Sequence, residues 1–439
     1  MPTSLVGQDR GFFDPVVETM NRRELRQLQE ARLLQLIPYV YARSALVREV
    51  WDAAGVKPGH IRSMQDYFEK VPCIDKDTIR NFRDRHDDPY GGTLCARPPH
   101  LKGVGFTGGT TGDPTPIVRS TESPSQFGNK RAYWGMGVRA GDFVTYIQYT
   151  SRLGHHADRW GNSGYRLFPL QQRAADIPRL VEGSRLLKPK VLHMLSTPLI
   201  IALEQYSKTT GTDLREVFSS YKGAVFGGEP LGPRFRKLVE SWGLEIFQLG
   251  TAEVASIMEC KAHDGMHVWE DTCIIEHLKP GTNEPAEKGE RGEPVVTALG
   301  DDVAPLMRFR LGDLTECSFD TCKCGRSHAR IWPIGRIGDE TMVRGRSVLP
   351  VDLMPIIQGI PETENGLFQI IRPQREVEIL QLRVGYDEGQ LANSIAALAS
   401  LVADAVKARL DLPVEVELVS NTELLRNRPP HKIPRVTKS

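Results

Sequence analysis

Residues 105–115 (GFTGGTTGDPT) combine the residue types that suit the binding of a phosphate group. Glycine permits positive φ and close backbone approach, so successive N–H groups can point toward one anion. Threonine hydroxyls add neutral donors to the same stretch. The pattern indicates a mobile loop that holds phosphate. A plain surface turn is the alternative, and the context along the chain must decide between the two.

Two further motifs place a glutamate just beyond a predicted buried strand. The apolar run at 224–226 leads into GGEP at 227–230, and the run at 244–249 leads into GTAE at 250–253. If these strands belong to a parallel sheet, their carboxyl ends share the edge at which such sheets bind ligands. Taken alone, either glutamate is better explained as a solvated turn residue.

Aspartates follow glycines at two later positions. RFRLGD at 308–313 and GRIGD at 335–339 both carry this arrangement after strand-like segments. One carboxylate can accept hydrogen bonds from both hydroxyls of a ribose, so the arrangement suits a nucleotide sugar. Structural turn aspartates are the alternative.

Cysteines and histidines form another candidate site. Cys322 and Cys324 lie in a tight CKCG turn, and Cys260 lies upstream with His263 and His267 close behind it. Three thiolates and one imidazole would complete a tetrahedral zinc site that is structural, because no position stays open for substrate. The spacing is not that of a standard zinc finger, and free thiols with surface histidines are the alternative. Residues that could replace one ligand are Cys273, Cys317 and His328.

The pattern along the chain predicts an α/β protein. A helical lead-in up to about residue 99 is followed by apolar runs that alternate with helices, which indicates βαβ units and a largely parallel sheet. From about residue 274, alternating apolar residues and turns indicate antiparallel β-structure. After residue 338, strand-like stretches at 377–384 and 413–419 and a helical stripe at 395–410 indicate a small α+β domain. The strands predicted for the parallel sheet are 143–149, 165–168, 191–195, 224–226 and 244–249.

Composition excludes several functional classes. The chain has 439 residues, enough for roughly two or three domains, with 40% apolar residues, 25% charged residues and a net charge of +1. Such a balance argues against a nucleic-acid binder, and no apolar run reaches the length that crosses a membrane. The N-terminal residues lack the pattern of a signal peptide, and seven cysteines are too few for a disulfide framework. We therefore expect a cytoplasmic protein.

Taken together, the chain resembles the phenylacetate–CoA ligase family of adenylate-forming enzymes nearly from end to end. Each motif is weak alone, but their order and spacing are specific. Many members also carry Cys…His…Cys-x-Cys with the histidine in a Gly-x-His context, which favours His267 over His263 and gives the zinc ligands Cys260, His267, Cys322 and Cys324. The motifs that carry the resemblance are the helical lead-in, 105–115, 226–230, 250–254, 308–313, Gly335 and Arg336 with Asp339, and Lys432.

The resemblance implies a two-step reaction. An aromatic carboxylic acid and ATP would give an acyl-adenylate with release of pyrophosphate, and the acyl group would then pass to coenzyme A. The implied architecture is a large adenylation domain, 1–338, with mixed and parallel sheets and a zinc-bearing β-rich subdomain, and a small mobile C-terminal domain, 339–439. The expected partners are a small acid and coenzyme A or another acceptor, with a homodimer as the candidate assembly. The implied cofactors are ATP, Mg²⁺, coenzyme A and structural Zn²⁺.

The resemblance also assigns roles to residues. Lys432 would place a positive charge between the attacking carboxylate and the α-phosphate, Glu253 would bind Mg²⁺, and Asp339 would be the hinge of the small domain. ATP would be held by Thr107, Gly109, Thr110, Thr111, Gly112, Gly228, Glu229, Pro230, Gly250, Thr251, Asp313 and Arg336. The first five of these would grip the β- and γ-phosphates, residues 228–230 would line the adenine pocket, and Asp313 and Arg336 would contact the ribose.

Four positions depart from the family pattern. Asp113 replaces a usual lysine, Leu249 an aromatic residue, Ala252 a hydroxyl residue and His431 a glycine. We expect Asp113 to face solvent, because a buried anion beside triphosphate would be costly. These departures motivate the hypothesis of a degenerate, non-catalytic nucleotide-binding protein. An enzyme that passes the acyl group to an amine or a carrier-protein thiol is the other alternative.

The acid pocket departs from relatives that use phenylacetate. Their glycine-rich aromatic segment is replaced here by TSRLGHHADRW at 150–160, which adds basic and polar groups. This favours a substituted aromatic acid, such as a hydroxy- or aminobenzoate, with Arg152 or His155 on the ring substituent. Histidines that cap a helix and face water are the alternative. Gly227 and Ala252 complete the predicted acid pocket.

Overall fold

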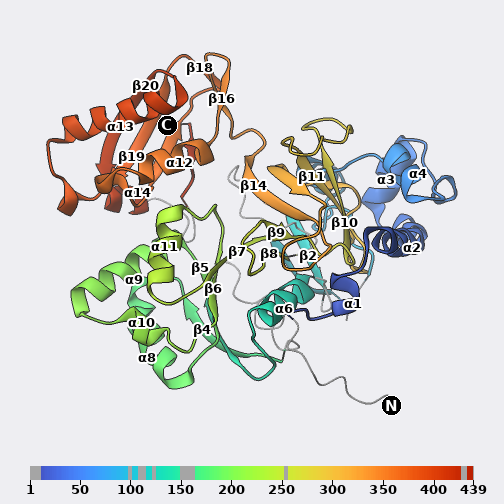
Figure 1. The fold of residues 1–439 in the computed structure, drawn as a ribbon. Coiled ribbons are helices and arrows are strands. Elements are labelled where there is room, and N and C mark those ends of the chain that lie inside the picture. The colour runs from blue at the N-terminus through green and yellow to red at the C-terminus, as the bar shows by residue number, and fades with distance from the viewer. Residues whose placement is uncertain are drawn as a thin grey trace.

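The computed structural model describes residues 11–96, 101–106, 115–120, 125–148, 164–251, 256–426 and 433–438. The N-terminal part is helical, as predicted, and is blue in Figure 1. The side chain of Asn21 accepts a hydrogen bond from the Glu24 N–H at 3.0 Å and so caps the start of α2. Its helices are α1 (Pro15–Glu18), α2 (Arg22–Arg43), α3 (Ala45–Ala53), α4 (Met64–Lys70) and α5 (Lys76–His86).

A nine-stranded sheet forms the centre of the molecule, in the order β13-β14-β9-β8-β7-β6-β5-β3-β4. The five strands predicted from apolar runs are all present and pair in parallel: β3 (Phe143–Gln148), β4 (Arg166–Gln171), β5 (Val191–Leu195), β6 (Gly223–Gly227) and β7 (Ile246–Thr251). The other four pair antiparallel: β8 (Ser256–Glu259), β9 (Met266–His267), β13 (Asp313–Ser318) and β14 (Arg330–Arg336). The sheet is therefore mixed.

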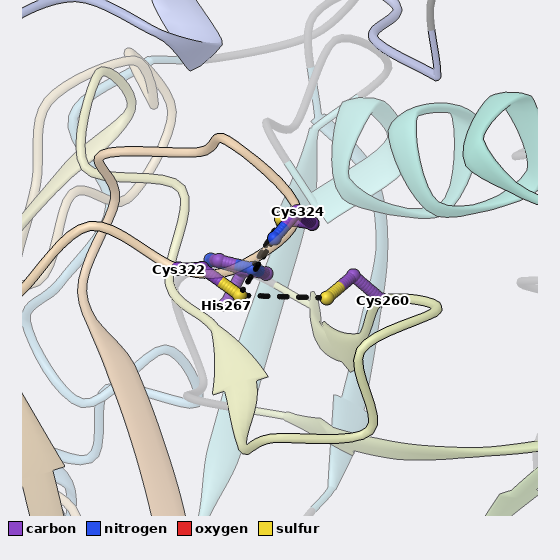
Figure 2. A group of neighbouring side chains, drawn as sticks. All are labelled: Cys260, His267, Cys322 and Cys324. Carbon is purple, nitrogen blue, oxygen red and sulfur yellow. Dashed lines mark hydrogen bonds between the residues drawn. The ribbon is translucent and has the colours of Figure 1, made fainter.

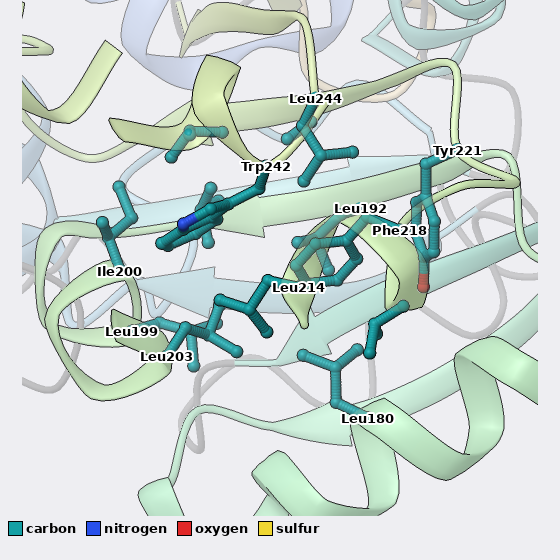
Figure 3. Packing of buried hydrophobic residues seen from close by; sticks show 14 of the residues in the cluster. Leu180, Leu192, Leu199, Ile200, Leu203, Leu214, Phe218, Tyr221, Trp242 and Leu244 are labelled. Atoms are coloured by element: carbon teal, nitrogen blue, oxygen red, sulfur yellow. The ribbon is translucent and has the colours of Figure 1, made fainter. Parts of the chain in front are cut away.

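Helices cover both faces of the parallel strands. Successive side chains of a strand point to opposite faces, and Leu192 of β5 packs in the core under α8–α11 while Val191 packs under α6 (Ser125–Gly135). Figure 3 shows the first of these cores, where Trp242, Phe218 and several leucines interdigitate. The helices over it are α8 (Ile177–Leu187), α9 (Thr197–Thr210), α10 (Leu214–Val217) and α11 (Pro233–Ser241).

Antiparallel structure is also present where it was predicted. A three-stranded sheet consists of β10 (Cys273–Leu278), β11 (Glu293–Ala298) and β12 (Phe309–Arg310). A separate hairpin pairs β1 (Leu101–Phe106) with β2 (Pro116–Ser120), and Phe106 lies opposite Pro116. This hairpin brackets the glycine- and threonine-rich segment, of which residues 107–114 lie outside the described part.

Residues after β14 form their own sheets and core, orange to red in Figure 1. Asp339 lies in the turn between β14 and β15, and its N–H donates to the Arg336 carbonyl at 3.0 Å. The small sheets are β16-β15-β18, with β15 (Thr341–Val343), β16 (Arg346–Val348) and β18 (Glu376–Val377), and β20-β19-β17-β21, with β17 (Phe368–Ile371), β19 (Leu380–Tyr386), β20 (Val414–Ser420) and β21 (Val436–Thr437). The helices are α12 (Pro350–Gln358), α13 (Ile395–Leu410) and α14 (Asn421–Arg426).

The predicted apolar stripe of α13 is only partly correct. Leu398, Val402 and Val406 are buried against the sheet, whereas the side chains of Ile395 and Leu401 are 48% and 50% exposed. A helix on one face of a sheet buries residues spaced by three and four. Leu401 lies to one side of the buried line, and Ile395 lies on that line but is the first residue of the helix. Among the described residues, no helix is long and apolar enough to cross a membrane.

Candidate active site and candidate metal centre

The ends of β6 and β7 bring the two glycine-containing turns to one edge of the sheet. The strands are parallel neighbours, with Gly227 opposite Leu249. A Cβ on Gly227 would lie 3.1 Å from the Leu249 carbonyl oxygen, so the two strands leave little room for a side chain there. Gly228 then turns the chain with φ +102°, a conformation that glycine adopts without strain. The predicted convergence of these motifs is therefore present.

Glu229 lies in this turn and its carboxylate is buried. Oε2 accepts from the Arg435 guanidinium at 3.1 Å, and the two side chains are only 5% and 11% exposed. Oε1 has no hydrogen-bond partner among the described residues. This buried carboxylate oxygen therefore keeps a hydrogen-bonding capacity that the described residues do not use.

The turn is tied to β7 by side-chain hydrogen bonds. The Leu231 N–H donates to the Gln248 side-chain oxygen at 3.0 Å, and the Gln248 amide donates to Glu259 at 2.8 Å. These bonds fix the turn against the strand that carries Gly250 and Thr251. The turn after β6 and the end of β7 are therefore held together at this edge of the sheet.

Asp313 and Arg336 are also brought together. They lie opposite each other on β13 and β14, and Arg336 Nη1 is 3.3 Å from Asp313 Oδ1. Both side chains are partly open to solvent, at 50% and 31% for the arginine and the aspartate. This exposure leaves the pair accessible to solvent, and its predicted contact with a ribose stays a prediction.

Arg308 behaves differently from its neighbours in the same motif. Its side chain is buried and bonds Glu276 through Nη2 at 2.7 Å and the carbonyls of Phe68 and Val71 through Nη1. It therefore joins the helical lead-in to the antiparallel sheet instead of facing the nucleotide edge. The motif alone gave no signal of this structural role.

Several predicted site residues cannot be located. They lie outside the described part of the chain and are Thr107, Gly109, Thr110, Thr111, Gly112, Asp113, Arg152, His155, Ala252, Glu253, His431 and Lys432. Of the segment around Lys432, the described portion resumes at Ile433.

The four predicted zinc ligands form one cluster, shown in Figure 2. The ligand atoms of Cys260, His267, Cys322 and Cys324 all lie within 4.8 Å of one another. Cys260 follows β8, His267 ends β9, and the two remaining cysteines lie in the turn after β13, where Gly325 has φ +91°. Neighbouring groups, first the Cys260 thiol and then the His267 ring, lower the pKa of Cys324, which favours the thiolate form that binds metal.

The surroundings of the cluster fix the histidine. His267 Nδ1 donates to the His328 carbonyl at 3.3 Å, which leaves Nε2 facing the Cys324 sulfur at 3.4 Å. Such a bond on the far ring nitrogen sets the tautomer of many metal-binding histidines. His263 points elsewhere, to Glu245 at 3.0 Å and Glu259 at 3.2 Å, and these bonds raise its pKa to about 9. The alternatives Cys273, Cys317 and His328 are not in the cluster.

Buried ion pairs surround the same region and were not anticipated. Arg131 of α6 binds Asp271 through two bonds of 2.6 and 2.7 Å, and Arg326, in the cysteine turn, binds Glu18 of α1 at 2.7 Å. All four side chains are buried. They connect α1, α6 and the cysteine turn through partners that are far apart in the sequence.

The C-terminal segment makes a contact that sequence reasoning also missed. Arg435 lies three residues after Lys432 and pairs with Glu229, as described above. Two more side chains of the C-terminal part reach the same stretch: Glu364 binds Arg234 at 2.7 Å, and Gln358 lies so close to Gly232 that a Cβ there would be 2.4 Å from its Nε2. The residues after β14, named the small C-terminal unit below, therefore contact residues 229–234.

The comparisons with known proteins agree with this arrangement. No family model matches the chain. A phenylacetate–coenzyme A ligase of Thermus thermophilus is 30% identical over 392 residues, with 86% of this chain and 85% of the relative covered. A crystal structure of a 2-hydroxyisobutyryl-CoA ligase in the postadenylation state with R3-HIB-AMP is similar with a TM-score of 0.86 at 25% identity, covering 100% of this chain and 94% of that chain.

A second structure of that ligase, with 2-HIB-AMP and CoA in the thioesterification state, has a TM-score of 0.68 at 27% identity, covering 99% of this chain and 94% of that chain. Because both structures are of one ligase, the difference in TM-score reflects how its parts are arranged, and the arrangement in our structure is more similar to the one in the postadenylation state. From the identity to the Thermus thermophilus enzyme over most of both sequences, we conclude that the chain belongs to the phenylacetate–coenzyme A ligase family of adenylate-forming, AMP-producing acid–coenzyme A ligases.

Proposed function

We propose that this protein activates a carboxylic acid with ATP to an acyl-adenylate, releases pyrophosphate and then forms the coenzyme A thioester. The observation that carries this proposal is the contact of Arg435 with Glu229, which brings the C-terminal segment onto the turn after β6. A catalytic lysine three residues before Arg435 would thereby be near a nucleotide held at that edge. Adenylate-forming CoA ligases use ATP and coenzyme A, which matches this two-step reaction.

The nucleotide would lie along the edge formed by β6, β7 and β13. Gly228, Glu229 and Pro230 would line the adenine pocket. Oε1 of Glu229, which has no hydrogen-bond partner among the described residues, would accept from the exocyclic amino group if nucleotide binding exposes it. Asp313 and Arg336 would hold the ribose, and Gly250 and Thr251 would lie beside the phosphates. Thr107, Gly109, Thr110, Thr111 and Gly112, in the segment between β1 and β2 in the sequence, would donate to the β- and γ-phosphates.

The chemical step needs stabilisation of negative charge at the α-phosphate. Lys432 would provide a cation between that phosphate and the attacking carboxylate. Glu253 would provide an oxygen ligand for Mg²⁺, which neutralises phosphate charge when bound. Rotation of the small domain, 339–439, about Asp339 would withdraw Lys432 and open the path for the thiol of coenzyme A.

A structural zinc ion is part of the proposal. The donor set of three sulfurs and one imidazole, gathered within 4.8 Å, fits tetrahedral Zn²⁺. Bound zinc would cross-link the segments after β8, β9 and β13. Four protein ligands close the site, so zinc would take no part in the reaction.

The acid is proposed to be a substituted benzoate, because the segment 150–160 carries basic residues where phenylacetate-using relatives have an aromatic, glycine-rich stretch. Arg152 or His155 would contact the ring substituent, and Gly227 and Ala252 would complete the pocket. The opposing acids are phenylacetate and 2-hydroxyisobutyrate, since these name the ligases described above.

The test is ATP–pyrophosphate exchange with four acids: 4-hydroxybenzoate, 2-aminobenzoate, phenylacetate and 2-hydroxyisobutyrate. We expect acid-dependent exchange without coenzyme A, fastest with a benzoate, and thioester with AMP once coenzyme A is added. Equal or faster exchange with phenylacetate would overturn the benzoate assignment. Exchange without any thioester would point to an amine or carrier-protein acceptor, and no exchange with any acid would refute the proposed reaction.

A further inference from the structure

Arg435 belongs to the last described segment of the chain, 433–438, which is built into the small C-terminal sheet. Val436 of β21 pairs with Ile370 of β17, and the Ile370 N–H donates to the Arg435 carbonyl at 2.7 Å. Ile433 is buried and packs with Leu367. The backbone on the C-terminal side of Lys432 is therefore fixed, and Arg435 cannot move without this strand.

The guanidinium of Arg435 contacts both parts of the molecule. Nη1 donates to the Gly366 carbonyl at 2.6 Å, and the group lies 4.7 Å from the centre of the Phe368 ring, both in the small unit. Nη2 donates to Glu229 at 3.1 Å, on the large sheet. The planar fork of arginine allows these bonds at once, whereas a lysine has a single charged nitrogen at the end of its chain.

Few residues separate this contact from Lys432. Three residues of extended chain span at most about 11 Å, so fixing Arg435 confines the catalytic lysine to the neighbourhood of the turn after β6. The other two contacts with residues 229–234 come from Gln358 and Glu364, which lie far from Lys432 in the sequence. Of the contacts described, the one through Arg435 acts directly on the lysine segment.

We propose that Arg435 is a positioning residue for adenylation. Its ion pair with Glu229 holds the segment that contains Lys432 against the adenine side of the nucleotide site. This inference rests on the proposed function. The two parts that the pair joins are arranged similarly to those of the ligase in its postadenylation state, so we assign the pair to the first half-reaction. We expect the pair to separate when the small unit moves to an arrangement like that of the thioesterification state.

The test separates the two half-reactions in Arg435→Met, which keeps an unbranched chain in place of the methylene stem of the arginine and removes the charge. We measure ATP–pyrophosphate exchange with the most active of the four acids, and single-turnover thioester formation from the synthetic acyl-adenylate of that acid and coenzyme A. Exchange should fall by about 10- to 100-fold, as expected for a misplaced catalytic group, while thioester formation stays within about threefold of the wild type.

Two comparisons make the result specific. Arg435→Lys should recover part of the exchange rate, and Arg435→Met should cost little more in a Glu229→Gln background, because the partner is already lost. Arg383→Met is the matched control: this arginine is on the same sheet and pairs only with Glu417 at 2.8 Å in the described structure, away from residues 229–234. It should keep both rates.

Three outcomes would contradict the inference. Exchange within about threefold of the wild type in Arg435→Met would show that the pair does not position the lysine. An equal fall in both half-reactions, with a lowered melting temperature, would mean that Arg435 only stabilises the fold. If the wild type gave no exchange with any of the four acids, the proposed function would fail and this inference with it.

Discussion

The imidazole of His267 is held from one side by the carbonyl of His328 and faces the sulfur of Cys324 on the other. Nδ1 lies 3.3 Å from the His328 carbonyl oxygen, and Nε2 lies 3.4 Å from the Cys324 sulfur. The backbone carbonyl therefore fixes the orientation of the ring. Three segments of the chain, the residue after β8, the end of β9 and the turn after β13, place their ligand atoms together. Preorganisation of this kind favours tight binding.

We expect about one zinc ion per chain. The double substitution Cys322→Ser with Cys324→Ser removes two of the four ligands and should abolish zinc binding. Elemental analysis of the purified protein measures the number of zinc ions per chain. The melting temperature should fall as well, because bound zinc ties together segments after three strands.

His263→Gln is the matched control for the zinc prediction. This histidine is close to Cys260 in the sequence but bonds Glu245 and Glu259. Its substitution should leave the zinc content unchanged, whereas His267→Gln should reduce it. Loss of zinc in the first variant and not in the second would reverse the ligand assignment.

Lys432→Ala should remove adenylation while sparing the second half-reaction. The loss of a positioned charge at the reacting phosphate typically costs on the order of 100- to 1000-fold in rate. Exchange should fall by this factor, and thioester formation from the synthetic acyl-adenylate should persist. Lys438→Ala tests whether any lysine of the tail suffices, since Lys438 is exposed. An unchanged exchange rate in Lys432→Ala would exclude this lysine from the chemistry.

Much of the fold was predictable because it is encoded locally. Each strand of the parallel sheet is a short apolar run between turns, and the ligand types of the zinc cluster are evident from the sequence. The strand-like stretch predicted at 413–419 is confirmed as β20, in which the residues between Val414, Val416 and Leu418 are exposed. The apolar stripe predicted for α13 includes Ile395 and Leu401, whose side chains are exposed. Such a stripe can be longer and wider than the part of the helix that packs against the sheet.

Long-range polar pairs could not be predicted. Glu229 and Arg435 are separated by most of the second half of the chain, and Glu18 and Arg326 by nearly three quarters of it. An ion pair leaves no periodic signal, so only the folded arrangement reveals it. The same holds for Arg308, whose motif suggested a role at the nucleotide edge and whose side chain instead joins Glu276 to the helical lead-in.

Removing the charge of Arg308 should destabilise the protein strongly. Arg308→Met leaves the Glu276 carboxylate buried without its cation, which typically costs about 3–5 kcal/mol in the free energy of unfolding. Urea denaturation measures the effect. The double variant with Glu276→Gln should be more stable than the single one, because no unpaired charge remains.

The control for Arg308 is Arg346→Met, whose pair with Asp411 is exposed. It should change the free energy of unfolding by less than about 0.5 kcal/mol. Equal effects in the two arginine variants would contradict the assignment of Arg308 as a buried link.

Burial of His193 predicts a loss of stability in acid. This side chain on β5 is enclosed, its Nδ1 lies 2.5 Å from the Tyr133 hydroxyl, and burial lowers its pKa from 6.5 to about 3. The folded state therefore prefers the neutral ring. The stability that this preference gives is fully present above the unfolded pKa of about 6.5 and declines as pH falls toward 3.

Between pH 7 and pH 4 the free energy of unfolding of the wild type should fall by up to about 3 kcal/mol more than that of His193→Gln, because glutamine takes up no proton at this position. Urea midpoints at several pH values measure the difference, and each variant is compared with itself at pH 7, so a constant cost of the substitution cancels. Parallel pH curves for the two proteins would mean that His193 can be protonated in the folded state without penalty. A steeper acid loss in the variant would contradict the prediction outright.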